Sequence, residues 1–221
     1  KSLVRVRDGG RFWMLEMLRE YAVERLQDSG EADEQRRRHA AYFGELAAEA
    51  APQVAGPVPG DSLDRLAAEH ANLSGALDFL HGRGEIAAAL RLAADLGDYW
   101  YFRGHSQEGA RRLAALLDAD RAGSSEARGR ALRAAGEMAI SRGDLVLARR
   151  LATEAFAIAE ERDDRRGRAV SGWQLGYVTA EEGDWVQARA LLEESVEAFR
   201  HLGDVHLVLG VTRILAWINY E

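Results

Sequence analysis

Hydrophobic and polar residues recur with a helical period along almost the whole chain. Apolar side chains repeat at three- and four-residue spacing in segments that end near glycine, a natural C-terminal cap of a helix. The first two such segments cover residues 16–29, which stop before Gly30, and roughly 31–50. Their inward faces are expected to hold Leu18, Tyr21, Ala22 and Leu26 in the first helix and Ala41, Phe43, Leu46 and Ala47 in the second.

The exception to the helical period is the N-terminal stretch of residues 2–15. There the runs LVRV and RFWML flank the sequence RDGG. Because Asp-Gly between two β-prone runs is a strong hairpin signal, we expect a short β-hairpin at this end of the chain.

All three prolines of the chain fall within residues 51–61. Proline removes a helical hydrogen bond and biases the preceding residue towards extended structure. This segment is therefore predicted to be a linker between a small N-terminal unit, residues 1–50, and a helical domain, residues 62–221.

From residue 62 onwards a repeat of about 40 residues is superimposed on the helical period. A small residue in mid-helix is followed seven positions later by a turn glycine and five positions further by a second small residue. The mid-helix pairs are Leu96-Gly97, Ala135-Gly136, Leu175-Gly176 and Leu215-Ala216, the turn glycines are Gly104, Gly143 and Gly183, and the second small residues are Gly109, Ala148 and Ala188. Stacked helical hairpins have a period of this kind.

Small residues at these positions let the two antiparallel helices of a hairpin approach closely, and the middle glycine lets the chain reverse. One hairpin cannot bury both of its faces, so neighbouring hairpins stack into a solenoid. The predicted fold is all-α: a right-handed solenoid of antiparallel helix hairpins, preceded by the β-hairpin and the linker helices. The predicted units are residues 90–122, 129–162 and 169–202, a partial unit at 209–221, and a degenerate leading hairpin at 62–89.

The stretch LGYVTAEEGDWVQA, residues 175–188, resembles the tetratricopeptide repeat in its small-residue positions and its turn glycine. The period here is nearer 40 residues than the usual value of about 34, so the helices are expected to be longer than consensus. The resemblance covers about residues 90–221 and implies a helical-repeat domain with an inner groove.

A second resemblance rests on the order of four segments: RFWMLEMLREYAVERL, RRRHAAYFGELAAEA, LDRLAAEHANLSGALDFL and LRLAADLGDYWYFRGHSQEGARRL. In this order they resemble the middle of large bacterial transcriptional regulators, many of them LuxR-type or antibiotic-regulatory. Such regulators join a signal-transduction ATPase to a winged helix and then to a tetratricopeptide sensor. The resemblance implies that residues 1–50 are the end of the winged-helix domain, with residues 2–15 as its wing.

The same resemblance places ATP in an upstream domain of the same chain. No Gly-rich phosphate loop followed by Lys and Ser or Thr occurs in this sequence, so no cofactor is expected here. The start without Met fits a piece cut from a longer protein.

Composition narrows the classes of function. The 221 residues are 47% hydrophobic and 29% charged, with a net charge of −7 and no cysteine. The lack of cysteine excludes disulfides and thiolate chemistry, and the negative charge argues against a surface that grips nucleic acid. Because no apolar run is long enough to span a bilayer and no signal core begins the chain, we expect a cytoplasmic protein without membrane contact.

No constellation of residues points to catalysis or to a metal. No nucleophile–base or paired-carboxylate arrangement stands out, so no enzyme activity is expected. The six histidines are scattered, and the nearest pair, His201 and His206, has no third ligand in sequence. The basic cluster QRRRHA, residues 35–40, follows three acidic residues and is expected to be a solvated helix face, with no direct nucleic-acid contact.

The first helix of each hairpin is expected to face the inner groove. The register of the repeat then assigns ten residues to the groove lining: Arg91, Asp98, Tyr101, Arg133, Glu137, Trp173, Tyr177, Arg213, Trp217 and Tyr220. Aromatic and arginine side chains on a concave surface are typical of recognition sites. The alternative is that Trp173 and Trp217 simply pack between adjacent hairpins, and the sequence leaves both interpretations open.

Two hypotheses follow for function. In the first, the chain is the sensor of a multidomain transcriptional regulator that binds a small-molecule inducer or a protein segment in the groove and relays occupancy to the ATPase module. In the second, it is a protein-interaction or self-association scaffold without a small ligand. The C-terminal helix, which ends at WINYE, is expected to expose an apolar side, and this favours a homodimer.

Overall fold

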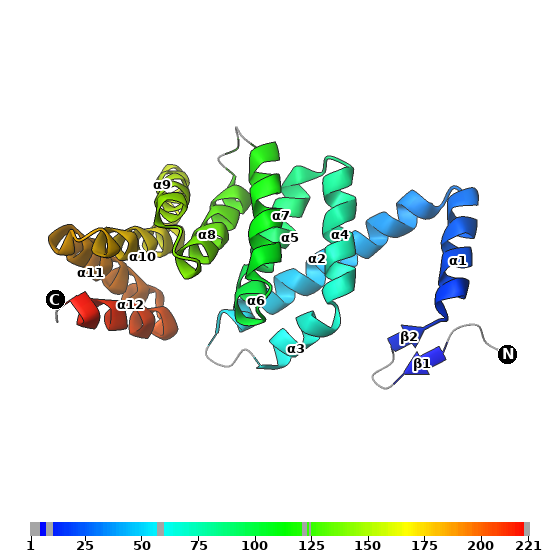
Figure 1. Ribbon diagram of the computed structural model, residues 1–221, viewed down its shortest axis with the longest axis horizontal. Helices are drawn as coiled ribbons and strands as arrows, with labels where there is room; N and C mark the ends of the chain where they lie inside the picture. The colour runs from blue at the N-terminus through cyan, green and yellow to red at the C-terminus, as the bar shows by residue number, and fades with distance from the viewer. Residues whose placement is uncertain (1–4, 8–10, 57–59, 121–122, 124, 219–221) are drawn as a thin grey trace.

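The computed structural model describes residues 5–7, 11–56, 60–120, 123 and 125–218. This part of the chain is an all-α solenoid preceded by two short strands (Figure 1). The strands β1 (Arg5–Arg7) and β2 (Arg11–Trp13) pair antiparallel, with Val6 opposite Phe12, and residues 8–10 between them lie outside the described residues. The helices are α1 (Glu16–Asp28), α2 (Ala32–Val54), α3 (Gly60–Ala68), α4 (His70–Gly82), α5 (Ile86–Asp95), α6 (Gly97–Phe102), α7 (Ser106–Ala119), α8 (Glu126–Ser141), α9 (Leu145–Glu161), α10 (Arg165–Glu181), α11 (Trp185–Leu202) and α12 (Val205–Ile218).

The two strands and α1 project from one end of the molecule, at the right of Figure 1. No residue of α1 is buried. Of its expected inward face, Leu18 and Leu26 are partly buried, whereas Tyr21 and Ala22 are exposed. Helix α1 therefore contributes no fully buried side chain to the core.

Helix α2 continues through Pro52 to Val54, so the expected linker of residues 51–61 begins later than predicted. Pro52 lies in the last turn, where its missing N–H removes only one helical hydrogen bond. The helical pattern persists beyond it, since the N–H of Ala55 donates to the carbonyl of Ala51 at 3.1 Å. Val54 is buried in the same cluster as side chains of α4 and α5, so the end of α2 belongs to the solenoid.

The buried face of α2 differs by one position from the predicted one. Phe43, Leu46 and Ala47 are buried as expected, but the prediction for Ala41 is wrong, because its side chain is exposed. Ala40 is buried instead and lies three and seven residues before Phe43 and Ala47, which places it on the same helical stripe.

The hairpins of the solenoid pair α7 with α5 and α6, α8 with α9, and α10 with α11, and α12 packs on α11. The turns fall at the predicted glycines. Gly104, Gly143 and Gly183 have φ of 76°, 73° and 89°, in the left-handed region that favours glycine. Each first helix begins three or four residues before the predicted unit.

An aspartate caps four successive helices at a step of 20 residues. In each, the carboxylate accepts a hydrogen bond from the backbone N–H three residues further on, a standard N-terminal cap. The four bonds are Leu147 N to Asp144 at 3.1 Å, Gly167 N to Asp164 at 2.8 Å, Gln187 N to Asp184 at 3.0 Å and Leu207 N to Asp204 at 3.3 Å. These caps fix where α9 to α12 begin.

The small mid-helix residues mark close helix contacts, but some of these contacts join neighbouring hairpins. A Cβ atom at Gly176 would lie 2.8 Å from Cγ of Leu192, so this glycine brings α10 against α11 of its own hairpin, as predicted. A Cβ atom at Gly97 would lie 2.8 Å from Cβ of Ala134 on α8. The prediction of a contact within the hairpin is therefore wrong at Gly97, which instead brings α6 against the next hairpin.

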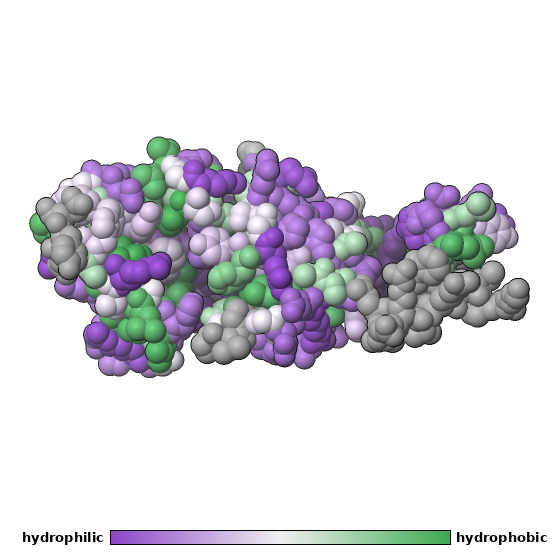
Figure 2. Space-filling model, turned by 60° about the horizontal axis from the view of Figure 1, so that its bottom comes forward, coloured by the Kyte–Doolittle hydropathy of each residue, from purple (hydrophilic) through white to green (hydrophobic). Residues whose placement is uncertain are grey.

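Two clusters of buried side chains form the core, one running from α2 to α10 and the other from α10 to α12. At the C-terminal end, Val205 and Leu209 of α12 are 67% and 66% exposed. Figure 2 shows hydrophobic side chains gathered on this end of the molecule, at the lower left.

Among the helices of the described residues, none has both the length and the hydrophobicity that crossing a bilayer requires.

Candidate functional site

The first helices of successive hairpins enclose a cavity of about 180 Å³, called here the central cavity. It is lined by Ala55 after α2, Ala94 of α5, Gly97, Asp98 and Phe102 of α6, Arg130, Arg133, Ala134 and Glu137 of α8, Arg166, Val170 and Trp173 of α10, and His206 and Leu207 of α12. The cavity shares six of these residues with a wider groove of about 1010 Å³ between the end of α2 and the start of α12. The two spaces are therefore adjacent.

Five of the ten predicted groove residues line these two spaces. Asp98, Arg133, Glu137 and Trp173 line the central cavity, although they come from three different hairpins. Arg91 lines the wider groove, together with Asp98.

The other predicted groove residues lie elsewhere, apart from Tyr220, which is outside the described residues. Tyr101 is exposed, with its ring edge-on to Phe102, and it is Phe102 that lines the cavity. Tyr177 forms a side-chain hydrogen bond with Glu181. Burial raises the pKa of the Tyr177 phenol, and the hydrogen bond to Glu181 and the negative charge of Glu181 raise it further.

Arg213 and Trp217 of α12 do not line either space. The ring of Trp217 packs edge-on against Trp185 of α11 at 5.5 Å, so this tryptophan packs between helices, as in the alternative interpretation. Trp173 does line the cavity, so the two tryptophans have different surroundings.

The hairpins after α8 contribute to the cavity from earlier positions, and this explains the misplaced residues. Helix α8 contributes residues 130–137, α10 contributes 166–173, and α12 contributes only 206 and 207. Relative to the 40-residue repeat, the lining of α10 begins about one helical turn earlier than that of α8, and the lining of α12 begins at the same repeat position as that of α10 but is confined to the start of the helix. A constant register therefore selects residues on α10 and α12 that lie too far along the helix.

Four further aromatic or charged side chains line the cavity without having been predicted from the sequence: Phe102, Arg130, Arg166 and His206. A sequence signal exists for two of them, because Arg166 and His206 stand at matching positions 40 residues apart, two residues after a capping aspartate. Arg130 lies one turn before the predicted Arg133 and Glu137 on the same face of α8.

Each of the three arginines in the cavity has a carboxylate partner. Arg130 pairs with Asp95 of α5, Arg133 lies 3.5 Å from Asp164, and Arg166 lies 3.2 Å from Asp204. Burial lowers the pKa of Arg133, although the charge of Asp164 opposes this effect. These pairs neutralise the arginines and join the first helices to one another across the cavity.

Asp98 and Glu137 remain as the two carboxyl groups of the cavity that no hydrogen bond or ion pair engages within the described residues. Burial, followed by the charge of Asp98, raises the pKa of Glu137 to about 7. Burial also raises the pKa of Asp98, against the opposing charges of Arg166, Arg130 and His206. Within the described residues, the cavity thus holds two acidic groups that form no ion pair, although the charges of Arg166 and Arg130 act on Asp98.

The cavity also borders a buried donor without an acceptor. The indole Nε1 of Trp173 is shielded from solvent and forms no hydrogen bond within the described residues. A buried polar atom without a partner is unusual, and it marks a place where a ligand or water can bind. The neighbouring Gln174 is held in place, since its Nε2 donates to the carbonyl of Arg133 at 2.9 Å.

A second cluster of polar side chains lies beside Tyr99 of α6. His70, His105 and Glu108 bring one potential ligand atom each to within 4.8 Å of the others. Sequence reasoning missed this cluster because His70 and Glu108 are 38 residues apart and belong to different helices.

Comparisons with known proteins give one informative similarity. No protein-family model matches the chain. Over 114 residues, half of its length, the chain is 36% identical to provisionally named HTH-type transcriptional regulators of Mycobacterium bovis and Mycobacterium tuberculosis. The chain spans only 12% of the length of these relatives.

A solved structure, the crystal structure of BtubC (BKLC) from P. vanneervenii, aligns with 84% of this chain and 91% of that chain, at 11% identity and a TM-score of 0.45. The similarity in sequence agrees with the class of protein indicated by the order of the four N-terminal segments. Across half of its length, the chain is similar to a segment of proteins named as transcriptional regulators.

Proposed function

We propose that this chain is a non-catalytic sensor region of a multidomain transcriptional regulator, and that its central cavity binds a small molecule carrying a positively charged group. The observation that carries the proposal is the pair of carboxyl groups, Asp98 and Glu137, which form no ion pair within the described residues in a cavity whose arginines are each paired with another carboxylate. The similarity to regulators of transcription supports the class of protein.

A cationic group suits the cavity for two physical reasons. Burial, together with repulsion from Asp98, raises the pKa of Glu137 to about 7, and a bound cation would relieve this repulsion. The cation would also meet the ring of Trp173, since a tryptophan face attracts cations by about 0.5–2 kcal/mol. An acceptor atom elsewhere on the ligand would satisfy the Nε1 donor of Trp173.

The walls of the wider groove provide a route for relay. The groove lies between the end of α2, which leads back to the N-terminal strands, and the start of α12. A ligand that contacts both sides favours the arrangement in which they are close, and a relay requires such a preference between two states. In the proposed regulator this change would reach the upstream ATPase module through α2 and α1.

A ligand screen tests the binding proposal. Small polyamines, amino alcohols and amino sugars are added to the chain, and thermal unfolding is followed for the wild type, Glu137→Gln and Glu193→Gln. Glu193 is an exposed residue of α11, so its substitution is the matched control. An amine that stabilises the wild type and the control but binds Glu137→Gln about tenfold more weakly supports the proposal, and equal binding by all three chains contradicts it.

The relay is tested separately in the full-length regulator. The amine found in the screen should change ATP turnover or transcription of a reporter by the wild type and the Glu193→Gln variant, but not by Glu137→Gln. If the amine binds but changes neither ATP turnover nor transcription, the proposed ligand site stands and the proposed relay is overturned.

Self-association is the second candidate function, favoured by the exposed apolar side chains of α12. Val205 and Leu209 are both about two-thirds exposed, and Trp217 is 37% exposed. Light scattering over a range of concentrations should detect a dimer that Leu209→Glu abolishes and that Arg189→Glu, on the exposed side of α11, does not. A monomer at all concentrations would exclude this function for the chain.

A further inference from the structure

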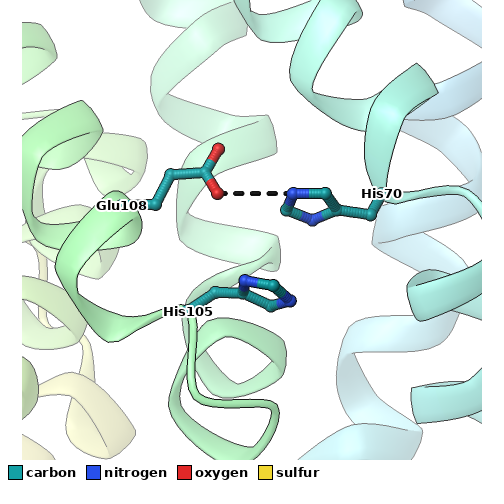
Figure 3. A group of neighbouring side chains, drawn as sticks. All are labelled: His70, His105 and Glu108. Carbon is teal, nitrogen blue, oxygen red and sulfur yellow. Dashed lines mark ion pairs between the residues drawn. The ribbon is translucent and has the colours of Figure 1, made fainter.

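The cluster of His70, His105 and Glu108 lies where the start of α4 meets the start of α7 (Figure 3). His70 is the first residue of α4, His105 immediately precedes α7, and Glu108 lies in the first turn of α7. All three side chains are partly buried, so they remain accessible to a small ion.

Two of the three potential ligand atoms already have the separation that a metal ion requires. Nε2 of His70 lies 3.3 Å from Oε2 of Glu108 (dashed line in Figure 3). In a tetrahedral zinc site with bonds of about 2.0–2.2 Å, neighbouring ligand atoms lie about 3.3–3.5 Å apart. A zinc ion can therefore bind both atoms with little movement of either.

The imidazole of His70 is oriented for ligation by a second residue. Oη of Tyr99 lies 3.0 Å from Nδ1 of His70, and Tyr99 is 99% buried, so the position of the phenol is fixed. When Nδ1 carries the proton and donates it to this oxygen, the lone pair is on Nε2, which faces Glu108. Metal-binding histidines usually have such a partner on the second ring nitrogen.

The carboxylate of Glu108 is likewise held by its other oxygen. Oε1 accepts hydrogen bonds from Ser74 at 3.2 Å and from Nε of Arg112 at 2.8 Å, which leaves Oε2 towards His70. The charge of Arg112 opposes a bound cation, but Arg112 also bonds to Asp78 at 2.6 Å. Arg112, Asp78 and Glu108 together carry a net charge of −1, which is compatible with a divalent ion.

His105 must rotate to complete the site. Its ring is stacked on that of His70, with centroids 4.4 Å apart and an angle of 18° between the planes. A metal ion lies in the plane of each ligating ring, so one ion cannot bind two parallel stacked rings. Rotation about the side-chain torsions of the partly exposed His105 would bring a ring nitrogen to the ion, and water would fill the fourth position.

We propose that His70, His105 and Glu108 form a binding site for a divalent transition-metal ion, with Zn²⁺ the ion that fits their chemistry best. Two imidazoles and one carboxylate are a common ligand set for zinc. The bound ion would connect α4 to α7 and so stiffen the junction between α4 and the hairpin formed by α5, α6 and α7. The proposal is independent of the function of the central cavity.

Titration with zinc chloride, in competition with a chromophoric chelator, tests the site in the metal-free 221-residue chain. The wild type should bind one ion, and His105→Ala should bind it at least about tenfold more weakly. His105 is the ligand of choice because its substitution leaves the hydrogen bond between His70 and Tyr99 intact. His81→Ala, at an exposed position near the end of α4, is the control and should bind like the wild type.

A thermal measurement gives a second readout. Zinc should raise the melting temperature of the wild type and of His81→Ala, and should leave His105→Ala and Glu108→Gln unchanged. No saturable binding by the wild type, or binding that persists in His105→Ala, would overturn the proposal. Loss of binding in His201→Ala would also overturn it, since His201 and Glu197 on α11 form a separate pair that lies 3.3 Å apart.

Discussion

Glu137 of α8 and Asp98 of α6 share the central cavity, and burial together with the charge of Asp98 raises the pKa of Glu137 to about 7. In the unfolded chain the pKa of this glutamate is near 4.5. Between these two values the folded protein retains a proton that the unfolded chain has released. Glu137 therefore makes the folded state less stable as the pH rises through this window.

Replacing Glu137 with glutamine removes this dependence on pH. At about pH 8 the Glu137→Gln variant should be more stable than the wild type, by up to about 3 kcal/mol. Near pH 4.5 the two chains should unfold at similar denaturant concentrations, because the wild-type carboxyl group is then protonated in the folded state. Urea denaturation at both pH values measures the difference. The exposed control Glu193→Gln should follow the wild type, and a Glu137→Gln variant that is no more stable at high pH would contradict the raised pKa.

The capping aspartates provide a second test, because two of them differ in one respect. The carboxylate of Asp184 caps α11, whereas that of Asp164 caps α10 and also lies 3.5 Å from the partly buried guanidinium of Arg133. Asp184→Ala should lower the free energy of unfolding by about 1 kcal/mol, the usual loss for a cap. Asp164→Ala should cost roughly twice as much, because it also leaves Arg133 without its carboxylate.

Asp164→Asn separates the two roles. Asparagine keeps the cap and loses the charge, so its stability should fall between those of the wild type and Asp164→Ala. Equal losses for Asp164→Ala and Asp184→Ala, measured by urea denaturation, would show that the pair with Arg133 contributes nothing to stability.

The close contact at Gly176 gives a third prediction. A Cβ atom there would lie 2.8 Å from Cγ of Leu192, which is fully buried, and 3.3 Å from the carbonyl oxygen of Ala188. Gly176→Ala should therefore destabilise the fold, by about 1–2 kcal/mol after the gain in helix propensity. Gly75→Ala, in the exposed interior of α4 with no atom near the added Cβ, should instead stabilise the fold by up to about 1 kcal/mol. Shifts of the same sign in thermal unfolding would contradict the assignment of Gly176 as a contact point.

The repeat predicted the fold well because its signals are local. A turn glycine, a capping aspartate and an apolar stripe each act within one or two helical turns, and Gly104, Gly143 and Gly183 all adopt the left-handed conformation that this pattern requires. Pro52 shows the limit of local rules. Its effect on the helix depends on how near it lies to the end of α2, and that end is set by packing of Val54 in the core.

The cavity could be predicted only in part because its shape depends on how hairpins rotate against one another. Asp98 and Glu137 lie on adjacent hairpins, and both line the cavity. By α12 the lining has moved to His206, away from the predicted Arg213. The cluster of His70 and Glu108 depends on the packing of α4 against α7, for which the sequence contains no repeat signal.

Arg128 gives the last prediction, because it is a buried charge at the junction between two hairpins. Its Nη1 donates to the carbonyls of Leu117 at 2.9 Å and Asp120 at 2.5 Å, and its Nε donates to Glu154 of α9 at 2.8 Å. Arg128→Met would keep most of the apolar stem but remove the guanidinium donor from both carbonyls, and the N–H of Gly123, at 3.2 Å, would be left as a donor to the carbonyl of Asp120. The expected loss of stability is about 2–4 kcal/mol, compared with less than about 0.5 kcal/mol for the exposed control Arg189→Met. Urea denaturation of the two variants measures both values, and equal stability would mean that solvent replaces the guanidinium at this junction.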